Sequence, residues 1–269
     1  MQQAIAVLDS GVGGLTVAKE VMRQLPREKI IYFGDTARTP YGPRSSEEIL
    51  KFTNQIVDYL LQFNPKMIVI ACNTATAAAL EYIRSSLSIP VVGVIHPGAR
   101  AAIKTTTKGI IGVIGTVGTI KSKAYEHALK QLSPNIQVVS LACPTFVPLV
   151  ERGLFDTKES RLIVKEALAP LHRLPLDCLI LGCTHYPFLR SAIADAMGSK
   201  VSLISSADET AREISTVLYH HSQLAQANDH PIHQFFCSGD SKMFQQITQE
   251  WLGEQIRVTP IVWQIPQIY

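Results

Sequence analysis

Short, unbroken runs of aliphatic and β-branched residues recur along this chain, and segments with helical periodicity separate them. The runs do not alternate apolar and polar residues, which is typical of strands buried on both faces of a parallel sheet. Strands that alternate with helices in this way predict an α/β fold with mostly parallel central sheets. We expect eight of these strands near residues 4–8, 29–33, 67–71, 91–95, 110–114, 136–141, 178–182 and 201–204.

The clearest helical pattern covers residues 46–63, where apolar side chains recur about every 3.6 residues. Ser45 and Glu48 predict a capping box at its start, because the serine hydroxyl can accept from the third helical N–H. The Asn64-Pro65 pair predicts its end.

The four-strand pattern occurs twice. In each half the first strand leads into a turn rich in Gly, Ser and Thr, and the third strand ends at a cysteine, Cys72 or Cys183. We interpret this as an internal duplication and expect two pseudo-symmetric open α/β domains facing each other across a cleft. Residues after about 207 add too few elements for an independent domain. The expected organisation is a discontinuous first domain of residues 1–96 and 208–263, a second domain of residues 97–207 and a C-terminal tail of residues 264–269.

Cys72 and Cys183 are the strongest candidates for chemistry. In parallel sheets, ligands bind at the carboxyl ends of strands, where both thiols stand. We expect each of them to stand where a strand becomes a helix, and a helix N-terminus favours the thiolate and lowers the thiol pKa from about 8.5 toward neutrality. The other interpretation is that a free cysteine packs as a small apolar residue, which we apply to Cys143, Cys178 and Cys237.

Two thiols on opposite sides of one cleft suit the inversion of a carbon acid. One thiolate removes the α-proton and the other thiol returns a proton from the opposite face. This chemistry needs neither metal nor cofactor if the cleft donates hydrogen bonds to the carbanion. The histidines lack metal-ligand spacing with the cysteines, and five cysteines without a CxxC pair argue against a disulfide framework in a reducing compartment.

Polar residues follow the other strand ends. Asp9 and Ser10 leave the first strand at its carboxyl end, where they suit an ammonium group and a carboxylate. The turn is not a dinucleotide fingerprint, because Thr16 stands where the third glycine belongs. Tyr41 and Gly42 fit either a surface turn or one wall of the cleft.

Two further residues each leave two interpretations open. His185, two residues after Cys183, is either a capping residue or a partner that lowers the thiol pKa or carries its proton. Glu151 is either a cleft carboxylate or an ordinary surface glutamate.

The composition, with 46% hydrophobic and 17% charged residues, is ordinary for a globular protein. A net charge of +3 with scattered basic residues gives no reason to expect nucleic acid or a membrane as partner. We find neither a signal peptide nor an apolar run of roughly 20 residues, so we expect a cytoplasmic protein.

Four segments carry a family resemblance, and they are DSGVGGLT at 9–16, GDTARTPYG at 34–42, ACNTAT at 71–76 and GCTHYP at 182–187. With these motifs the chain resembles the glutamate racemases of the cofactor-independent aspartate/glutamate racemase superfamily. The resemblance runs from residue 1 to about 263. It implies interconversion of L- and D-glutamate for peptidoglycan synthesis, with no cofactor and commonly as a homodimer.

The resemblance also implies roles for individual residues. Cys72 would be the base toward D-glutamate, assisted by Asp9, and Cys183 the base toward L-glutamate, assisted by His185 and Glu151. A carboxylate contact would come from Thr116 or Thr119, and both remain open. The implied substrate-binding residues are Asp9, Ser10, Tyr41, Gly42, Asn73, Thr74, Thr184 and His185.

Three alternatives remain beside this hypothesis. One is a racemase for aspartate or another acidic amino acid, because the thiol pair does not select the substrate. A second is a non-catalytic protein that binds an amino acid between two domains, although binding alone requires no thiols. A third is a redox sensor in which Cys72 and Cys183 form a disulfide on oxidation.

Overall fold

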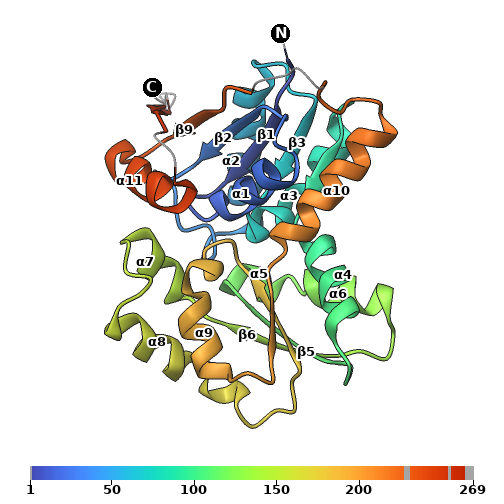
Figure 1. Ribbon diagram of the computed structural model, residues 1–269, viewed down its shortest axis with the longest axis vertical. Helices are drawn as coiled ribbons and strands as arrows, with labels where there is room; N and C mark the ends of the chain where they lie inside the picture. The colour runs from blue at the N-terminus through green and yellow to red at the C-terminus, as the bar shows by residue number, and fades with distance from the viewer. Residues whose placement is uncertain (1, 227–230, 254–255, 264–269) are drawn as a thin grey trace.

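Two parallel sheets organise the protein in a computed structural model that describes residues 2–226, 231–253 and 256–263 (Figure 1). The first sheet has the order β10-β9-β2-β1-β3-β4 and the second the order β6-β5-β7-β8. Every pairing is parallel, which confirms the predicted fold class. The strands are β1 (Ile5–Asp9), β2 (Ile30–Gly34), β3 (Met67–Ile70), β4 (Val91–Gly93), β5 (Ile110–Gly115), β6 (Gln137–Ala142), β7 (Cys178–Gly182), β8 (Ser202–Ile204), β9 (Gln234–Cys237) and β10 (Val258–Pro260).

Helices cover both sheets. They are α1 (Leu15–Gln24), α2 (Ser46–Leu61), α3 (Asn73–Ser86), α4 (Ile95–Thr105), α5 (Val117–Lys121), α6 (Ala124–Leu132), α7 (Phe146–Glu151), α8 (Lys158–Leu168), α9 (Arg190–Met197), α10 (Ala207–His220) and α11 (Ser241–Leu252), with 3₁₀ turns η1 (Ala169–Leu171) and η2 (Tyr186–Leu189). The capping box predicted for α2 forms, because Ser45 Oγ accepts from the N–H of Glu48 at 3.2 Å. The helix ends slightly earlier than predicted.

Burial explains why the strand sequences do not alternate. On β1, Ile5 and Val7 pack into one apolar cluster, while Ala6 and Leu8 pack into another on the opposite face of the sheet. Fully burying a side chain such as Ile or Leu contributes about 1.5–3 kcal/mol, so both faces stabilise the strand. The first of these clusters also contains Leu181 of β7, so one apolar core extends across both sheets.

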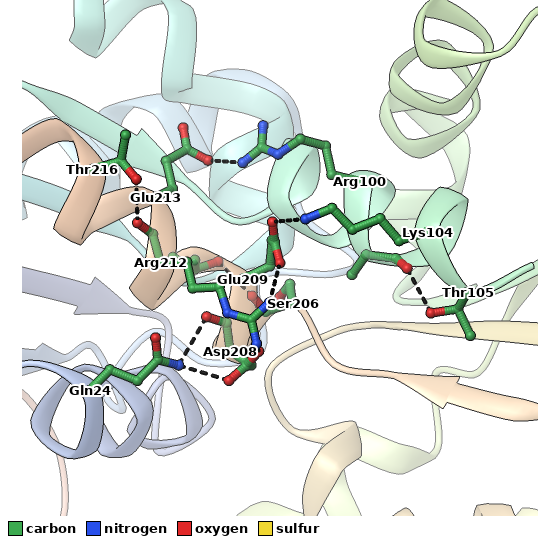
Figure 2. Close-up of polar contacts among 12 residues, drawn as sticks. Gln24, Arg100, Lys104, Thr105, Ser206, Asp208, Glu209, Arg212, Glu213 and Thr216 are labelled. Atoms are coloured by element: carbon green, nitrogen blue, oxygen red, sulfur yellow. Dashed lines mark hydrogen bonds and ion pairs between the residues drawn. The ribbon is translucent and has the colours of Figure 1, made fainter.

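The chain passes between the two sheets at α4 and at α10. Figure 2 shows that Arg100 on α4 pairs with Glu213 on α10, and that Gln24 on α1 donates to Asp208 at 2.8 Å. Lys104 adds an ion pair to Glu209, so α10 is tied to both helices that flank it. The domain boundaries proposed from the sequence fall within two residues of the starts of α4 and α10. The proposed tail at 264–269 lies outside the described residues.

Across the three described ranges, the structure contains no helix with the length and apolarity needed to cross a membrane.

Candidate active site

Both candidate cysteines stand at the carboxyl edge of a sheet. β3 ends at Ile70, and Cys72 is the N-cap of α3, where its Sγ accepts from the N–H of Ala75 at 3.5 Å. Cys183 directly follows β7. The helix start expected at Cys183 was wrong, because the chain instead forms the short 3₁₀ turn η2 before α9 begins at Arg190.

The structure brings both cysteines to one small cavity. This cavity lies between the two sheets and is narrow, with a volume of about 10 Å³. Its lining combines both halves of the chain, namely Ser10, Pro40, Tyr41, Gly42, Cys72, Asn73, Thr74, Thr116, Val147, Cys183, Thr184 and His185. The two remaining predicted residues, Asp9 and Glu151, do not line the cavity but contact residues that do, Thr184 and His185 respectively.

Cys72 has a buried and largely uncharged environment. Its Sγ lies 3.6 Å from Ser10 Oγ. Burial raises the pKa of Cys72 to about 12, and the nearby carboxylate of Asp9 adds to this shift. The expected lowering of the thiol pKa was therefore wrong for Cys72, because desolvation outweighs the donors at the start of α3.

Asp9 is fully buried behind Cys72 and joins the two halves of the site. One carboxylate oxygen accepts from the N–H of Gly11 at 3.0 Å, and the other accepts from Thr184 Oγ1 at 3.0 Å. Burial raises the pKa of Asp9, although His185 and these hydrogen bonds oppose the shift. A carboxyl group of this kind can exchange a proton within a dry site.

Cys183 has titratable neighbours. His185 Nδ1 lies 3.7 Å from Cys183 Sγ, and His185 Nε2 lies 2.5 Å from Glu151 Oε1. Burial alone lowers the pKa of His185, but the hydrogen bonds to Cys183 and Glu151 raise it well above the usual value of 6.5. Glu151 also accepts from the N–H of Val12 at 3.3 Å, so it is a carboxylate between the two sheets rather than an ordinary surface residue.

Hydroxyl and amide groups complete the lining. Thr74 Oγ1 lies 2.9 Å from Thr116 Oγ1 and 3.1 Å from Thr119 Oγ1. Of the two threonines left open by the sequence, Thr116 lines the cavity and Thr119 does not. Asn73 Oδ1 accepts from Tyr125 at 2.7 Å, whereas Asn73 Nδ2 is buried with no partner in the described structure. An unpaired buried donor is costly, so Asn73 is suited to a ligand acceptor.

The Tyr41-Gly42 segment is a wall of the cavity rather than an exposed turn. The Tyr41 hydroxyl donates to Asp35 Oδ2 at 2.5 Å, and Asp35 does not line the cavity. The carbonyl of Gly42 accepts from the N–H of Gly118 at 2.9 Å, across the two halves of the chain. A Cβ at Gly42 would lie 2.7 Å from Thr116 Cβ, so only glycine fits this close approach.

Sequence reasoning missed several residues of the site. Val147 and Pro40 line the cavity, and Tyr125 orients Asn73. Tyr125 lies on the buried face of the amphipathic helix α6, where it looks like an ordinary core residue. In the described part of the chain, no group of three or more His, Cys, Asp or Glu side chains has an arrangement suited to a metal ion.

Comparison with known proteins places this geometry in a family. The model of the Asp/Glu/Hydantoin racemase family matches residues 9–214. The chain is 55% identical to the glutamate racemase of Bacillus cereus (strain ATCC 10987) over 256 residues, which is 95% of each protein.

Two solved structures are similar over nearly their full length. Glutamate racemase isoform RacE1 from Bacillus anthracis has a TM-score of 0.93 and 55% identity, covering 96% of this chain and 97% of that one. Glutamate racemase from Francisella tularensis, solved in complex with D-glutamate, has a TM-score of 0.89 and 34% identity, covering 98% of each chain. By family match, sequence identity and fold, the chain belongs to the Asp/Glu/Hydantoin racemase family.

Proposed function

We propose that this chain is a glutamate racemase that inverts the α-carbon of glutamate by proton transfer between the thiols of Cys72 and Cys183. The observation that carries the proposal is the meeting of these two thiols, one from each sheet, in one cavity. The 55% identity to glutamate racemases supports glutamate as the substrate.

The proposed reaction starts with one thiolate and one thiol. With D-glutamate bound, the Cys72 thiolate removes the α-proton, the electron pair of the C–H bond remains on the carbon as a carbanion, and Cys183 gives its proton to the opposite face. The products are L-glutamate, a Cys72 thiol and a Cys183 thiolate, so no proton is gained or lost. The reverse direction exchanges the two roles.

The neighbours of each thiol have different tasks in this proposal. The raised pKa of His185 keeps it positively charged, which stabilises the Cys183 thiolate at a distance of 3.7 Å. Glu151 accepts a hydrogen bond from the other ring nitrogen of His185, Nε2, and so fixes the orientation of the imidazole. Because Cys72 lacks such a partner, Ser10 and the N-terminus of α3 provide its hydrogen bonds. Asp9 is the carboxyl group that assists proton exchange at Cys72.

Substrate recognition relies on neutral donors. The unpaired Nδ2 of Asn73 and the hydroxyl of Thr116 suit a substrate carboxylate. Ser10, Thr74 and Thr184 add donors to the cavity, and Tyr41 and Gly42 close one side. These groups also stabilise negative charge as it develops beside the α-carbon.

Incubation with L-glutamate in D₂O, without added cofactor, tests the proposal. We expect optical activity to decay while deuterium enters the α-position, followed by circular dichroism and NMR. A faster reaction with L-aspartate would favour the racemase of another acidic amino acid. No reaction with either would favour the binding protein. A disulfide between Cys72 and Cys183 under mild oxidation would favour the redox sensor.

Chelators and carbonyl reagents should leave the rate unchanged, because two thiols suffice for the proton transfers.

The proposal extends to a role in peptidoglycan synthesis, a cytoplasmic location and a homodimer, as the family resemblance implies. Sedimentation of the purified protein measures the oligomeric state directly.

A further inference from the structure

Asp35 is a buried carboxylate outside the cavity, and four donors use both of its oxygens. Oδ2 accepts from Arg38 Nε at 2.6 Å and from the Tyr41 hydroxyl at 2.5 Å. Oδ1 accepts from Ser238 Oγ at 2.7 Å and from Trp263 Nε1 at 2.9 Å. A carboxylate offers about four lone-pair positions, so Asp35 is fully engaged.

The two oxygens face different parts of the chain. Arg38 and Tyr41 belong to the loop 36–42, whose residues 40–42 line the cavity. Ser238 and Trp263 follow β9 and β10, at the far end of the sequence. Asp35 thus connects the cavity wall to the C-terminal segment 261–263.

Further contacts hold the C-terminal segment against the same loop. The N–H of Ile261 donates to the carbonyl of Cys237 at 2.7 Å. The guanidinium of Arg38 lies 4.3 Å from the ring centroid of Trp263 and 4.2 Å from that of Phe52. Trp263 also packs on Phe33, with ring centroids 5.4 Å apart. Stacking and hydrogen bonding therefore fix Trp263 in one place beside the loop.

The inner end of the loop reaches the opposite half of the protein. Gly42 accepts from the N–H of Gly118 on α5, and it sits against Thr116. A shift of Tyr41 would therefore displace a wall of the cavity and a contact between its two halves.

We propose that Asp35 is a positioning residue that uses Trp263 and Ser238 to hold the Tyr41-Gly42 wall in its substrate-binding position. This inference rests on the proposed racemase function, because the wall is assigned to glutamate. Asp35 touches neither the thiols nor the cavity, so its effect on catalysis passes through Tyr41.

The Asp35→Asn variant tests the coupling. The amide NH₂ replaces one acceptor oxygen and faces two donors, so either the loop or the C-terminal segment loses its hydrogen bonds. We expect KM for D-glutamate to rise about tenfold, as expected for one lost hydrogen bond to a charged group, while kcat changes less than threefold. Trp263→Phe keeps the aromatic stacking but removes the N–H donor, and we expect KM to rise about threefold.

Asp177→Asn is the matched control. Asp177 is also nearly buried and also accepts four hydrogen bonds, from the side chain of Thr106, the side chain and N–H of Thr107 and the N–H of Lys108. It precedes β7, at the sheet edge opposite to the cysteines. This variant should lower the melting temperature and leave KM unchanged.

Hydrogen exchange of residues 36–42 separates this inference from the proposed function, since it needs no activity. Exchange should become faster in Asp35→Asn and Trp263→Phe, and stay unchanged in Asp177→Asn. If wild-type protein does not racemise glutamate but exchange follows this pattern, only the assignment of the substrate fails. The inference is overturned if exchange and KM in both test variants match wild type, or if Asp177→Asn raises KM equally. Should Asp35→Asn not fold, Trp263→Phe alone decides.

Discussion

The surroundings of Cys72 and Cys183 differ more than their positions in the fold. Each thiol stands at the carboxyl edge of a parallel sheet. Cys72 has a hydroxyl and a helix N-terminus as hydrogen-bonding partners, whereas Cys183 has a histidine held by a glutamate. A repeated backbone arrangement therefore places two thiols alike, while side chains specific to each half decide how each proton is handled.

The largest expected effect tests what the two thiols share. Replacing Cys72 or Cys183 by serine should lower racemisation by about 10²–10⁴-fold, the usual contribution of a general acid or base. Cys178→Ser is the matched control, because Cys178 is equally buried but lies at the start of β7, away from the cavity. Full activity in either test variant, followed by polarimetry, would refute the two-base mechanism.

An irreversible reaction is needed to see the two thiols separately. L- and D-glutamate have equal free energy, so kcat/KM must be equal in both directions of racemisation. Elimination of HCl from β-chloroglutamate needs one base only and has no such constraint. We expect Cys72→Ser to retain chloride release from the L-analogue, and Cys183→Ser from the D-analogue. Loss with both analogues in either variant would indicate that the thiol is structural.

Glu151→Gln should weaken the reaction that depends on Cys183 and spare the reaction that depends on Cys72. The amide no longer stabilises a charged His185, so the thiolate of Cys183 loses its support. We expect elimination from the L-analogue to fall about tenfold or more, and elimination from the D-analogue to change little. Equal losses with both analogues would mean that Glu151 acts on the whole cavity.

Ser10→Ala is the converse test, with a smaller effect. The substitution removes a hydroxyl that lies 3.6 Å from Cys72 Sγ. In the wild-type protein the hydrogen bond from this hydroxyl lowers the pKa of the thiol. Elimination from the D-analogue should fall about threefold to tenfold, in keeping with one modest hydrogen bond. The L-analogue serves as the internal control, and a larger loss with it would contradict the assignment.

The last prediction concerns stability at alkaline pH rather than activity. The folded protein holds the proton of Cys72 up to a pKa of about 12, whereas the usual value is 9. Above the lower value the unfolded chain loses a proton that the folded chain keeps. Each such thiol then costs about 1.4 kcal/mol of stability per pH unit until the higher value is reached. The melting temperature of Cys72→Ser should therefore fall less than that of wild type between pH 9 and 11. Parallel curves of melting temperature against pH for the two proteins would contradict the raised pKa of Cys72.

The parts predicted from the sequence depend on local patterns. The central strands β1, β3 and β7 were predictable because both of their faces are apolar and buried, and the cysteines were predictable because they follow two of these strands. The missing helix start at Cys183 reflects the i→i+3 hydrogen bonds at Tyr186 and Phe188, which tighten this stretch into a 3₁₀ turn.

The parts not predicted depend on the whole fold. The raised pKa of Cys72 comes from burial by residues distant in sequence. The role of Glu151 was undecided because its partners, Val12 and His185, come from different halves of the chain. The four donors to Asp35 lie at positions 38, 41, 238 and 263, and no local pattern connects them.

The order of strands in the first sheet has a consequence for how the protein is made. β2 pairs with β1 on one side and with β9 on the other, but β9 follows all four strands of the second sheet in sequence. On the ribosome, the outer edge of β2 therefore stays unpaired while the whole second sheet is synthesised. Because domains fold as units, the second sheet completes its pairing first, although the first sheet begins earlier. β9 then pairs with this edge as one of the last steps, and its Phe235 and Phe236 join the apolar clusters on the two faces of the sheet.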